Sequence, residues 1–219
     1  MIASVQQILT KRNIFSHINE AITVATIKNQ DEAMSLLAQC LYTIVDRKTA
    51  LYLSGGKTPK ELYARLAHEE LLLAGAVGQV DERYGMPFHE KSNQKMIAET
   101  DLLRYLQIRD IRFYPILQRE KSREETAEIY DQTVRSLNAT LQRSVAILGI
   151  GTDGHTAGLP AQSSKVKSQK LKIFDTYDLV TEYNDTSGKY DERITMTFLG
   201  LSMIDVLLVV VLGEDKRDA

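Results

Sequence analysis

Apolar residues along this chain occur in two patterns that alternate with each other. Short continuous apolar runs are typical of buried strands, whereas stretches with apolar residues three or four positions apart are typical of helices. The last run is apolar at every position, which predicts a central parallel strand covered on both faces. The predicted strands are residues 50–53, 76–80, 145–148, 171–174 and 206–212.

Two segments with helical spacing are residues 31–46 and 59–73. Cys40 lies on the apolar stripe of the first segment, so we expect a core residue rather than a nucleophile. Thr58 is expected to cap the second helix, and Glu61 completes a capping-box pattern with it.

Ser122 and Glu125 form another capping-box pattern before a third amphipathic stretch. Strands that alternate with helices predict an α/β protein. We therefore expect a doubly wound, mainly parallel sheet flanked by helices, of the Rossmann-like type. In such sheets, ligands bind beyond the carboxyl ends of the strands.

Composition restricts the class of protein. The 219 residues are 43% hydrophobic and 26% charged, and no linker or repeat divides them, so one domain over residues 1–219 is expected. The net charge of −2 argues against general nucleic-acid binding. The longest apolar run is too short to span a bilayer, and the N-terminus lacks the pattern of a signal peptide. With one cysteine and no possible intramolecular disulfide, a cytoplasmic protein is expected.

Polar loops that contain glycine follow three of the predicted strands, at 54–58, 149–156 and 213–216. If these strands are parallel, the three loops lie on one edge of the sheet. Asp81 and Arg83 follow another predicted strand and would join them. A charge cluster of this kind is usually a solvated surface, but its place after a strand favours a role in a site.

The loop at 54–58 has the composition of a phosphate cradle. Its glycines let the backbone approach an anion, and the helix that follows points its N-terminus at the same place. An ordinary strand-to-helix turn is an equally good interpretation of the spacing alone, and the P-loop spacing is absent. The candidate residues are Ser54, Gly55, Gly56, Lys57 and Thr58.

The loop at 149–156 contains the spacing G-x-G-x-x-G, which is the nominal fingerprint of dinucleotide binding. That fingerprint requires a long helix from its third glycine. Gly158 and Pro160 interrupt the segment instead, so we interpret the match as accidental. Gly151 and Gly154 are better explained as residues that bring backbone N–H groups to a polarised ligand.

His155 is the candidate catalytic base of this loop. Histidine has the side chain whose unperturbed pKa suits proton transfer near neutral pH. Asp153 lies two residues away and could orient the ring. A structural histidine is the alternative for an isolated residue, but the glycine-rich loop favours a catalytic one. The other histidines have no ligand spacing with His155, so no metal site is expected.

Arg193 and Lys216 are candidate donors to a phosphate group. Considered alone, each could be a surface residue. Its position after the most strand-like segment of the chain favours a role in the site for Lys216.

Together these segments resemble the 6-phosphogluconolactonase family, which is related to the glucosamine-6-phosphate isomerase/deaminase enzymes. The resemblance extends from about Ala50 to Lys216. Arg83 at the end of the second motif, and the absence of a glutamate soon after His155, favour the lactonase branch. The family's motifs S-G-G-x-T-P, D-E-R with S-N, G-x-G-x-D-G-H-T-A, R-I-T-x-T and G-x-x-K match Ser54–Pro59, Asp81–Arg83 with Ser92–Asn93, Gly149–Ala157, Arg193–Thr197 and Gly213–Lys216.

The chain departs from the family pattern in two places. The family continues H-T-A-S-L-F-P, whereas Gly158, Leu159 and Pro160 follow Ala157 here, which affects the expected pocket wall. In the family, a helix follows the last strand. This sequence ends at Ala219, shortly after its last predicted strand, so we expect a domain that lacks the usual C-terminal elements.

The resemblance implies hydrolysis of 6-phospho-D-glucono-1,5-lactone in the oxidative pentose phosphate pathway, by a monomer or small homo-oligomer. His155 would be the general base, oriented by Asp153 or Asp81, and Arg83 or loop N–H groups would stabilise the oxyanion. No metal or organic cofactor is expected. The alternatives are a glucosamine-6-phosphate isomerase/deaminase and a non-catalytic sugar-phosphate-binding homologue. The expected substrate-binding residues are Ser54, Gly55, Gly56, Lys57, Thr58, Gly151, Gly154, Arg193 and Lys216.

Overall fold

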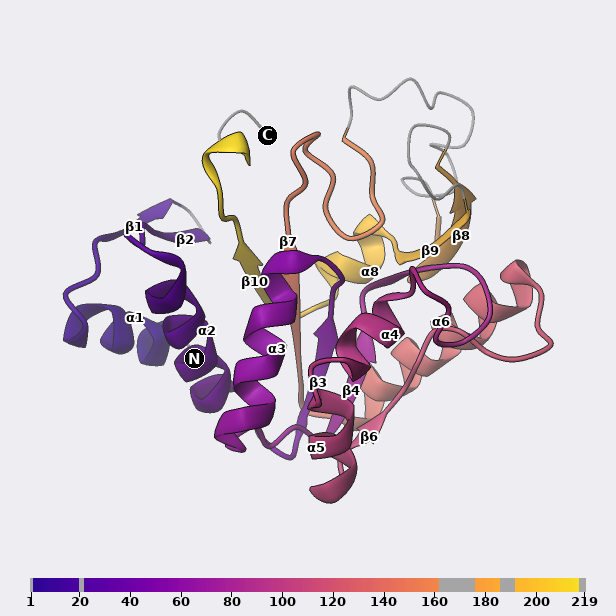
Figure 1. Cartoon of the computed structure of the whole chain (residues 1–219), viewed down its shortest axis with the longest axis horizontal. Helices are drawn as coiled ribbons and strands as arrows, with labels where there is room; N and C mark the ends of the chain where they lie inside the picture. The colour runs from indigo at the N-terminus through magenta and orange to yellow at the C-terminus, as the bar shows by residue number, and fades with distance from the viewer. Residues whose placement is uncertain (1, 20–21, 162–175, 186–191, 217–219) are drawn as a thin grey trace.

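The computed structural model describes residues 2–19, 22–161, 176–185 and 192–216. A five-stranded sheet forms its centre (Figure 1). Every pair of neighbouring strands in this sheet is parallel, which confirms the predicted mainly parallel sheet. The strands follow the order β10 (Val206–Val210), β7 (Arg143–Gly149), β3 (Thr49–Leu53), β4 (Ala76–Gln79) and β6 (Arg112–Phe113).

Helices cover both faces of the sheet, as a doubly wound fold requires. Because side chains alternate along a strand, Leu51 and Leu53 of β3 face one helical layer while Ala50 and Tyr52 face the other. The first layer consists of α2 (Gln30–Ile44), α3 (Lys57–Glu69) and α5 (Leu102–Ile108), and the second is α6 (Arg123–Thr140).

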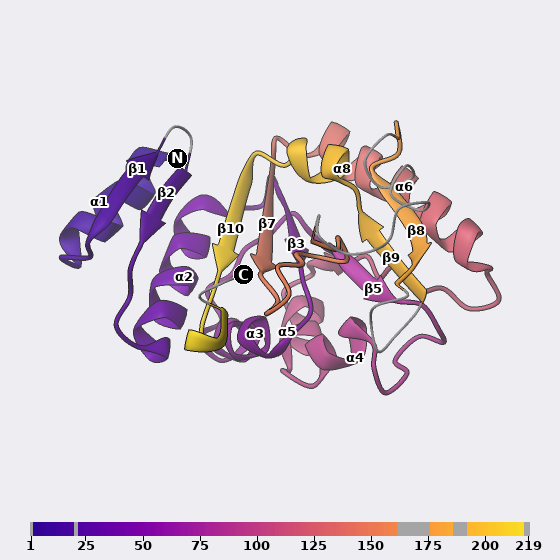
Figure 2. The ribbon, with the colours of Figure 1, turned by 90° about the horizontal axis from the view of Figure 1, so that it is seen from above.

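A second sheet, of three antiparallel strands, lies beside the first and had no clear signal in the sequence (Figure 2). Its order is β5 (Asp81–Arg83), β9 (Glu192–Met196) and β8 (Val180–Asn184). Only Val80 separates β4 from β5, and its carbonyl accepts from the amide of Met196 in β9 at 2.8 Å. The chain therefore passes directly from the parallel sheet into the antiparallel one.

The remaining elements are short and lie around these layers. A hairpin of β1 (Ser16–Asn19) and β2 (Ile22–Ala25) lies near α1 (Ile2–Lys11), which packs on α2 around Cys40. Cys40 is buried, as predicted, and burial raises the pKa of its thiol to about 11. The other elements are α4 (Asn93–Ala98), α8 (Phe198–Ser202) and the 3-10 turn η1 (Glu214–Lys216).

The prediction that 206–212 forms a central strand covered on both faces is wrong. Among the described strands, β10 pairs only with β7 and lies at the edge of the sheet. Leu207 and Val209 are 41% and 50% exposed, so one face of β10 is uncovered by the described residues. A fully apolar run shows that a strand is hydrophobic, but the run does not say which neighbours cover it.

The capping predictions gave mixed results. Ser122 Oγ accepts from the Glu125 amide at 3.1 Å while Glu125 accepts from the Ser122 amide, which confirms the second capping box. The expected cap at Thr58 is wrong, because Gly56 precedes the helix with a φ of +109° and makes no side-chain cap. This turn lets α3 begin at Lys57, and the helix ends at Glu69 rather than at 73.

The strand predicted at 171–174 lies outside the described residues. No described helix has the length and apolar character needed to cross a membrane.

Candidate active site

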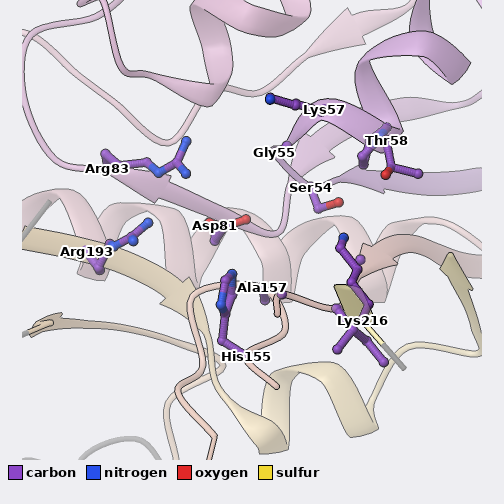
Figure 3. A pocket seen from close by; sticks show the side chains of 15 residues that line it. Ser54, Gly55, Lys57, Thr58, Asp81, Arg83, His155, Ala157, Arg193 and Lys216 are labelled. Atoms are coloured by element: carbon purple, nitrogen blue, oxygen red, sulfur yellow. The ribbon is translucent and has the colours of Figure 1, made fainter. Parts of the chain in front are cut away.

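The carboxyl ends of β3, β4, β7 and β10 meet at one edge, as predicted (Figure 1). A pocket of about 200 Å³ opens there (Figure 3). Every predicted site residue lines this pocket except Asp153 and Gly154. The lining residues are Ser54, Gly55, Gly56, Lys57, Thr58, Pro59, Asp81, Arg83, Gly149, Ile150, Gly151, His155, Ala157, Arg193 and Lys216.

The loop after β3 forms one wall, directly before the N-terminus of α3. The Gly55 backbone passes so close to Asn93 that an added Cβ would lie 2.0 Å from Asn93 Oδ1. The Tyr63 hydroxyl donates to the Ser54 carbonyl at 2.9 Å and so fixes the backbone of the loop. Ser54 lines the pocket, and its Oγ is buried with no hydrogen-bond partner among the described residues.

Two arginines face each other on adjacent strands of the antiparallel sheet. Arg83 of β5 and Arg193 of β9 are register partners, so their side chains leave the sheet on the same face (Figure 3). Two positive charges in this arrangement repel each other, and an anion bound between them would offset that repulsion. Within the described residues, Arg193 pairs with the carboxylate of Asp185 at 3.5 Å.

The loop after β7 places His155 at the pocket wall, with its side chain about half exposed. His155 Nδ1 contacts Asp153 Oδ1, so the structure brings together the histidine and one of its two candidate partners. Partial burial raises the pKa of Asp153, but hydrogen bonds from the His155 side chain and backbone outweigh that effect and hold it below its ordinary value. Asp153 is therefore ionised near neutral pH.

Several amides of this loop donate hydrogen bonds within it. The Gly151 amide donates to the His155 carbonyl at 2.8 Å, and the Gly154 amide donates to the Gly151 carbonyl at 3.1 Å. Gly154 has a φ of +81°, a conformation that favours glycine. The glycines of the G-x-G-x-x-G spacing thus build a tight turn that presents His155.

The pocket has more cations than carboxylates. Lys57, Arg83, Arg193 and Lys216 line it, and among the described lining residues Asp81 is the one carboxylate. Within the described part of the chain, Lys57 and Lys216 form no ion pair. The site therefore suits an anionic ligand. No cluster of three or more metal-ligating side chains occurs among the described residues.

Gly158, where the sequence departs from the family pattern, ties the His155 loop to the antiparallel sheet. Its amide donates to Thr195 Oγ1 at 3.0 Å, and its carbonyl accepts from the Tyr183 hydroxyl. Leu159 beside it is buried. The glycine permits a close approach that a side chain would prevent.

We expect Gly158→Ser to lower the free energy of unfolding by about 1–3 kcal/mol. An added Cβ would lie 2.7 Å from Thr195 Cβ, so the loop or β9 must shift. Urea unfolding would measure the loss. Gly149→Ala is the matched control, because its Cβ would meet no atom nearer than 3.8 Å. Equal stability of the two variants would contradict the assigned contact.

Sequence reasoning missed two buried residues beside the pocket. Glu82 and Asn93 are 0% and 1% exposed and contact Asp81, Arg83 or both through hydrogen bonds. The sequence showed them only as letters in the D-E-R and S-N motifs, with no sign that they meet.

A family model described as "Glucosamine-6-phosphate isomerases/6-phosphogluconolactonase" matches residues 28–219. The match covers most of the chain and includes every residue of the pocket. The chain belongs to this family. The family includes both an isomerase and a lactonase, so membership alone does not choose between the two reactions.

Relatives of this chain are named as members of the lactonase branch, and a solved structure shares its fold. The 6-phosphogluconolactonase of Rhizobium meliloti is 32% identical over 183 residues, which are 83% of this chain and 76% of that protein. The 6-phosphogluconolactonase of Helicobacter pylori strain J99 is 33% identical over 75% of this chain and 67% of its own length. The fold matches the 6-phosphogluconolactonase structure from Plasmodium vivax with a TM-score of 0.73 and 17% identity, over 98% of this chain and 84% of that one.

Proposed function

We propose that this protein hydrolyses 6-phospho-D-glucono-1,5-lactone to 6-phosphogluconate, as a cytoplasmic enzyme of the oxidative pentose phosphate pathway. The observation that carries the proposal is the His155–Asp153 contact at the wall of a cationic pocket. The relatives named 6-phosphogluconolactonase support this substrate class.

The proposed reaction begins with His155 as general base. The ionised Asp153 accepts a hydrogen bond from the Nδ1–H group of His155, which leaves Nε2 as the nitrogen that takes a proton from water. The resulting hydroxide adds to the C1 carbonyl and forms a tetrahedral oxyanion. When the bond from C1 to the ring oxygen breaks, the imidazolium returns its proton to that oxygen. The half-exposed position of His155 supports this role because water can reach it.

Arg83 is the better candidate for stabilising the oxyanion. The alternative donors were amides of the His155 loop, but those of Gly151 and Gly154 already donate within the loop. A guanidinium offers several N–H donors in a fixed geometry and adds a full positive charge.

The phosphate group is proposed to bind at the cationic rim of the same pocket. Arg193 and Lys216 supply charge, and the 54–58 loop supplies backbone N–H groups at the start of α3. Holding the phosphate orients the far end of the substrate toward His155, so binding energy is used to position the carbonyl.

The proposed function is tested by offering both family substrates to the wild-type protein. We expect 6-phosphogluconate to form from the lactone faster than spontaneous opening allows, and no ammonia to be released from glucosamine 6-phosphate. Ammonia release would identify the isomerase/deaminase, with Asp81 as its base at C2. Thermal stabilisation by 6-phosphogluconate without turnover would identify a non-catalytic homologue.

A further inference from the structure

Asn93 contacts two separate segments of the pocket at once, β5 and the loop after β3. Its Oδ1 accepts from Arg83 Nη1 at 2.6 Å, and its Nδ2 donates to the Asp81 carbonyl at 2.8 Å. The same amide packs on Gly55, which has no room for a Cβ beside it. One buried side chain therefore links the loop after β3 to the backbone and guanidinium of β5.

Glu82 in turn holds Asn93 in place. It lies between Asp81 and Arg83 on β5, so its side chain points away from the pocket and into the protein. Glu82 Oε1 accepts from two backbone N–H groups, that of Asn93 at 2.7 Å and that of Arg83 at 2.8 Å. A buried carboxylate of this kind is costly unless donors surround it.

The second carboxylate oxygen of Glu82 accepts two further hydrogen bonds. Oε2 accepts from the Gln94 amide at 2.8 Å and from Gln79 Nε2 at 3.0 Å. Gln79 is itself oriented, because its Oε1 accepts from the Ile116 amide at 3.0 Å. Four N–H groups thus converge on one side chain, and they connect β4, β5 and the first turn of α4.

We infer that Asn93 is a positioning residue of the anion pocket: it fixes the Arg83 guanidinium beside Gly55 and is anchored by the buried carboxylate of Glu82. Arg83 has a long, flexible side chain, and Arg193 opposite it repels its charge. Arg83 Nη1 also donates to the Lys91 carbonyl at 3.4 Å, but its hydrogen bond to Asn93 is much shorter, at 2.6 Å, and is the one that we infer fixes the guanidinium beside Gly55. Asn93 holds it in place before any ligand arrives. The reaction that this serves rests on the proposed lactonase function.

A double-mutant cycle tests whether Asn93 acts through Arg83. Affinity would be measured by calorimetry for wild type, Asn93→Ala, Arg83→Ala and the double variant. The ligands are 6-phosphogluconate, whose C1 carboxylate is expected at Arg83, and inorganic phosphate, a small anion that can reach every cation of the pocket, Arg83 included. We expect Asn93→Ala to weaken binding about tenfold when Arg83 is present, and less than twofold in the Arg83→Ala protein. An equal factor in both backgrounds would overturn the inference.

Gln94→Ala is the matched control for a merely structural effect. Gln94 is the next residue of α4, is similarly buried, and contacts Glu82 only through its backbone amide. We expect Gln94→Ala to lower Tm while leaving the affinity for both ligands within twofold of wild type. If Gln94→Ala weakens binding as much as Asn93→Ala does, Asn93 has only a general structural role.

A second variant keeps the test decisive if Asn93→Ala does not fold. Asn93→Asp preserves the shape and the oxygen that faces Arg83. It adds a negative charge beside the guanidinium and removes the N–H donor to the Asp81 carbonyl. We expect Asn93→Asp to weaken phosphate binding more in the Arg83→Ala protein than in the wild-type background. Equal effects in both would contradict the coupling.

The test also separates this inference from the proposed function. A wild-type protein that hydrolyses no lactone would contradict the function, whereas the cycle with inorganic phosphate would still measure the coupling of Asn93 to Arg83. Conversely, an active enzyme without that coupling would contradict only the inference.

Discussion

Replacing His155 with alanine is expected to lower kcat for lactone hydrolysis by about 10²- to 10⁴-fold, with a much smaller change in KM. The imidazole is proposed to act on water in the transition state rather than to bind the substrate. Its removal therefore takes away a proton acceptor and leaves the cationic pocket intact. The assay must subtract spontaneous opening of the lactone, which sets the lowest rate that can be measured.

His68→Ala is the control for this experiment, because that histidine lies on α3 and outside the pocket. We expect it to retain wild-type kcat. Asp153→Asn should fall between the two variants, since it keeps a partner for the ring but removes the negative charge that stabilises the imidazolium. A near-normal kcat for His155→Ala would remove His155 from the role of base.

Replacing Arg193 with alanine is expected to raise KM by about 10- to 100-fold and to leave kcat within a few-fold of wild type. The estimate corresponds to losing one hydrogen bond to a charged group, worth about 1.5–3 kcal/mol. Binding made equally in the ground state and in the transition state affects KM rather than kcat. Steady-state kinetics over a wide range of lactone concentration would measure both constants.

Arg112→Ala is the control for the arginine prediction. Arg112 is exposed, lies over the ring of Tyr114 and is not part of the pocket. We expect its removal to leave KM unchanged. An unchanged KM for Arg193→Ala would count against phosphate binding by Arg193, and a loss confined to kcat would assign Arg193 to the oxyanion instead.

The sequence alone predicted the parallel sheet and the edge at which its loops meet. That success has a local cause: apolar runs mark β3, β4 and β7, and glycine or charged residues follow each of them directly. Parallel strands then bring those loops together without further information. The same local patterns identified the 54–58 loop, His155 and both arginines as candidate site residues, and the structure places all of them at one pocket.

Tertiary structure alone decided how those candidates meet. The register of β5 with β9, which places Arg83 opposite Arg193, depends on pairing between segments 110 positions apart along the chain. Glu82 and Asn93 have no local signature, because their roles arise only when the start of α4 packs against β5. The exposed face of β10 likewise depends on its neighbours. Hydrophobic periodicity reports what a segment can bury, whereas register and packing determine which residues it meets.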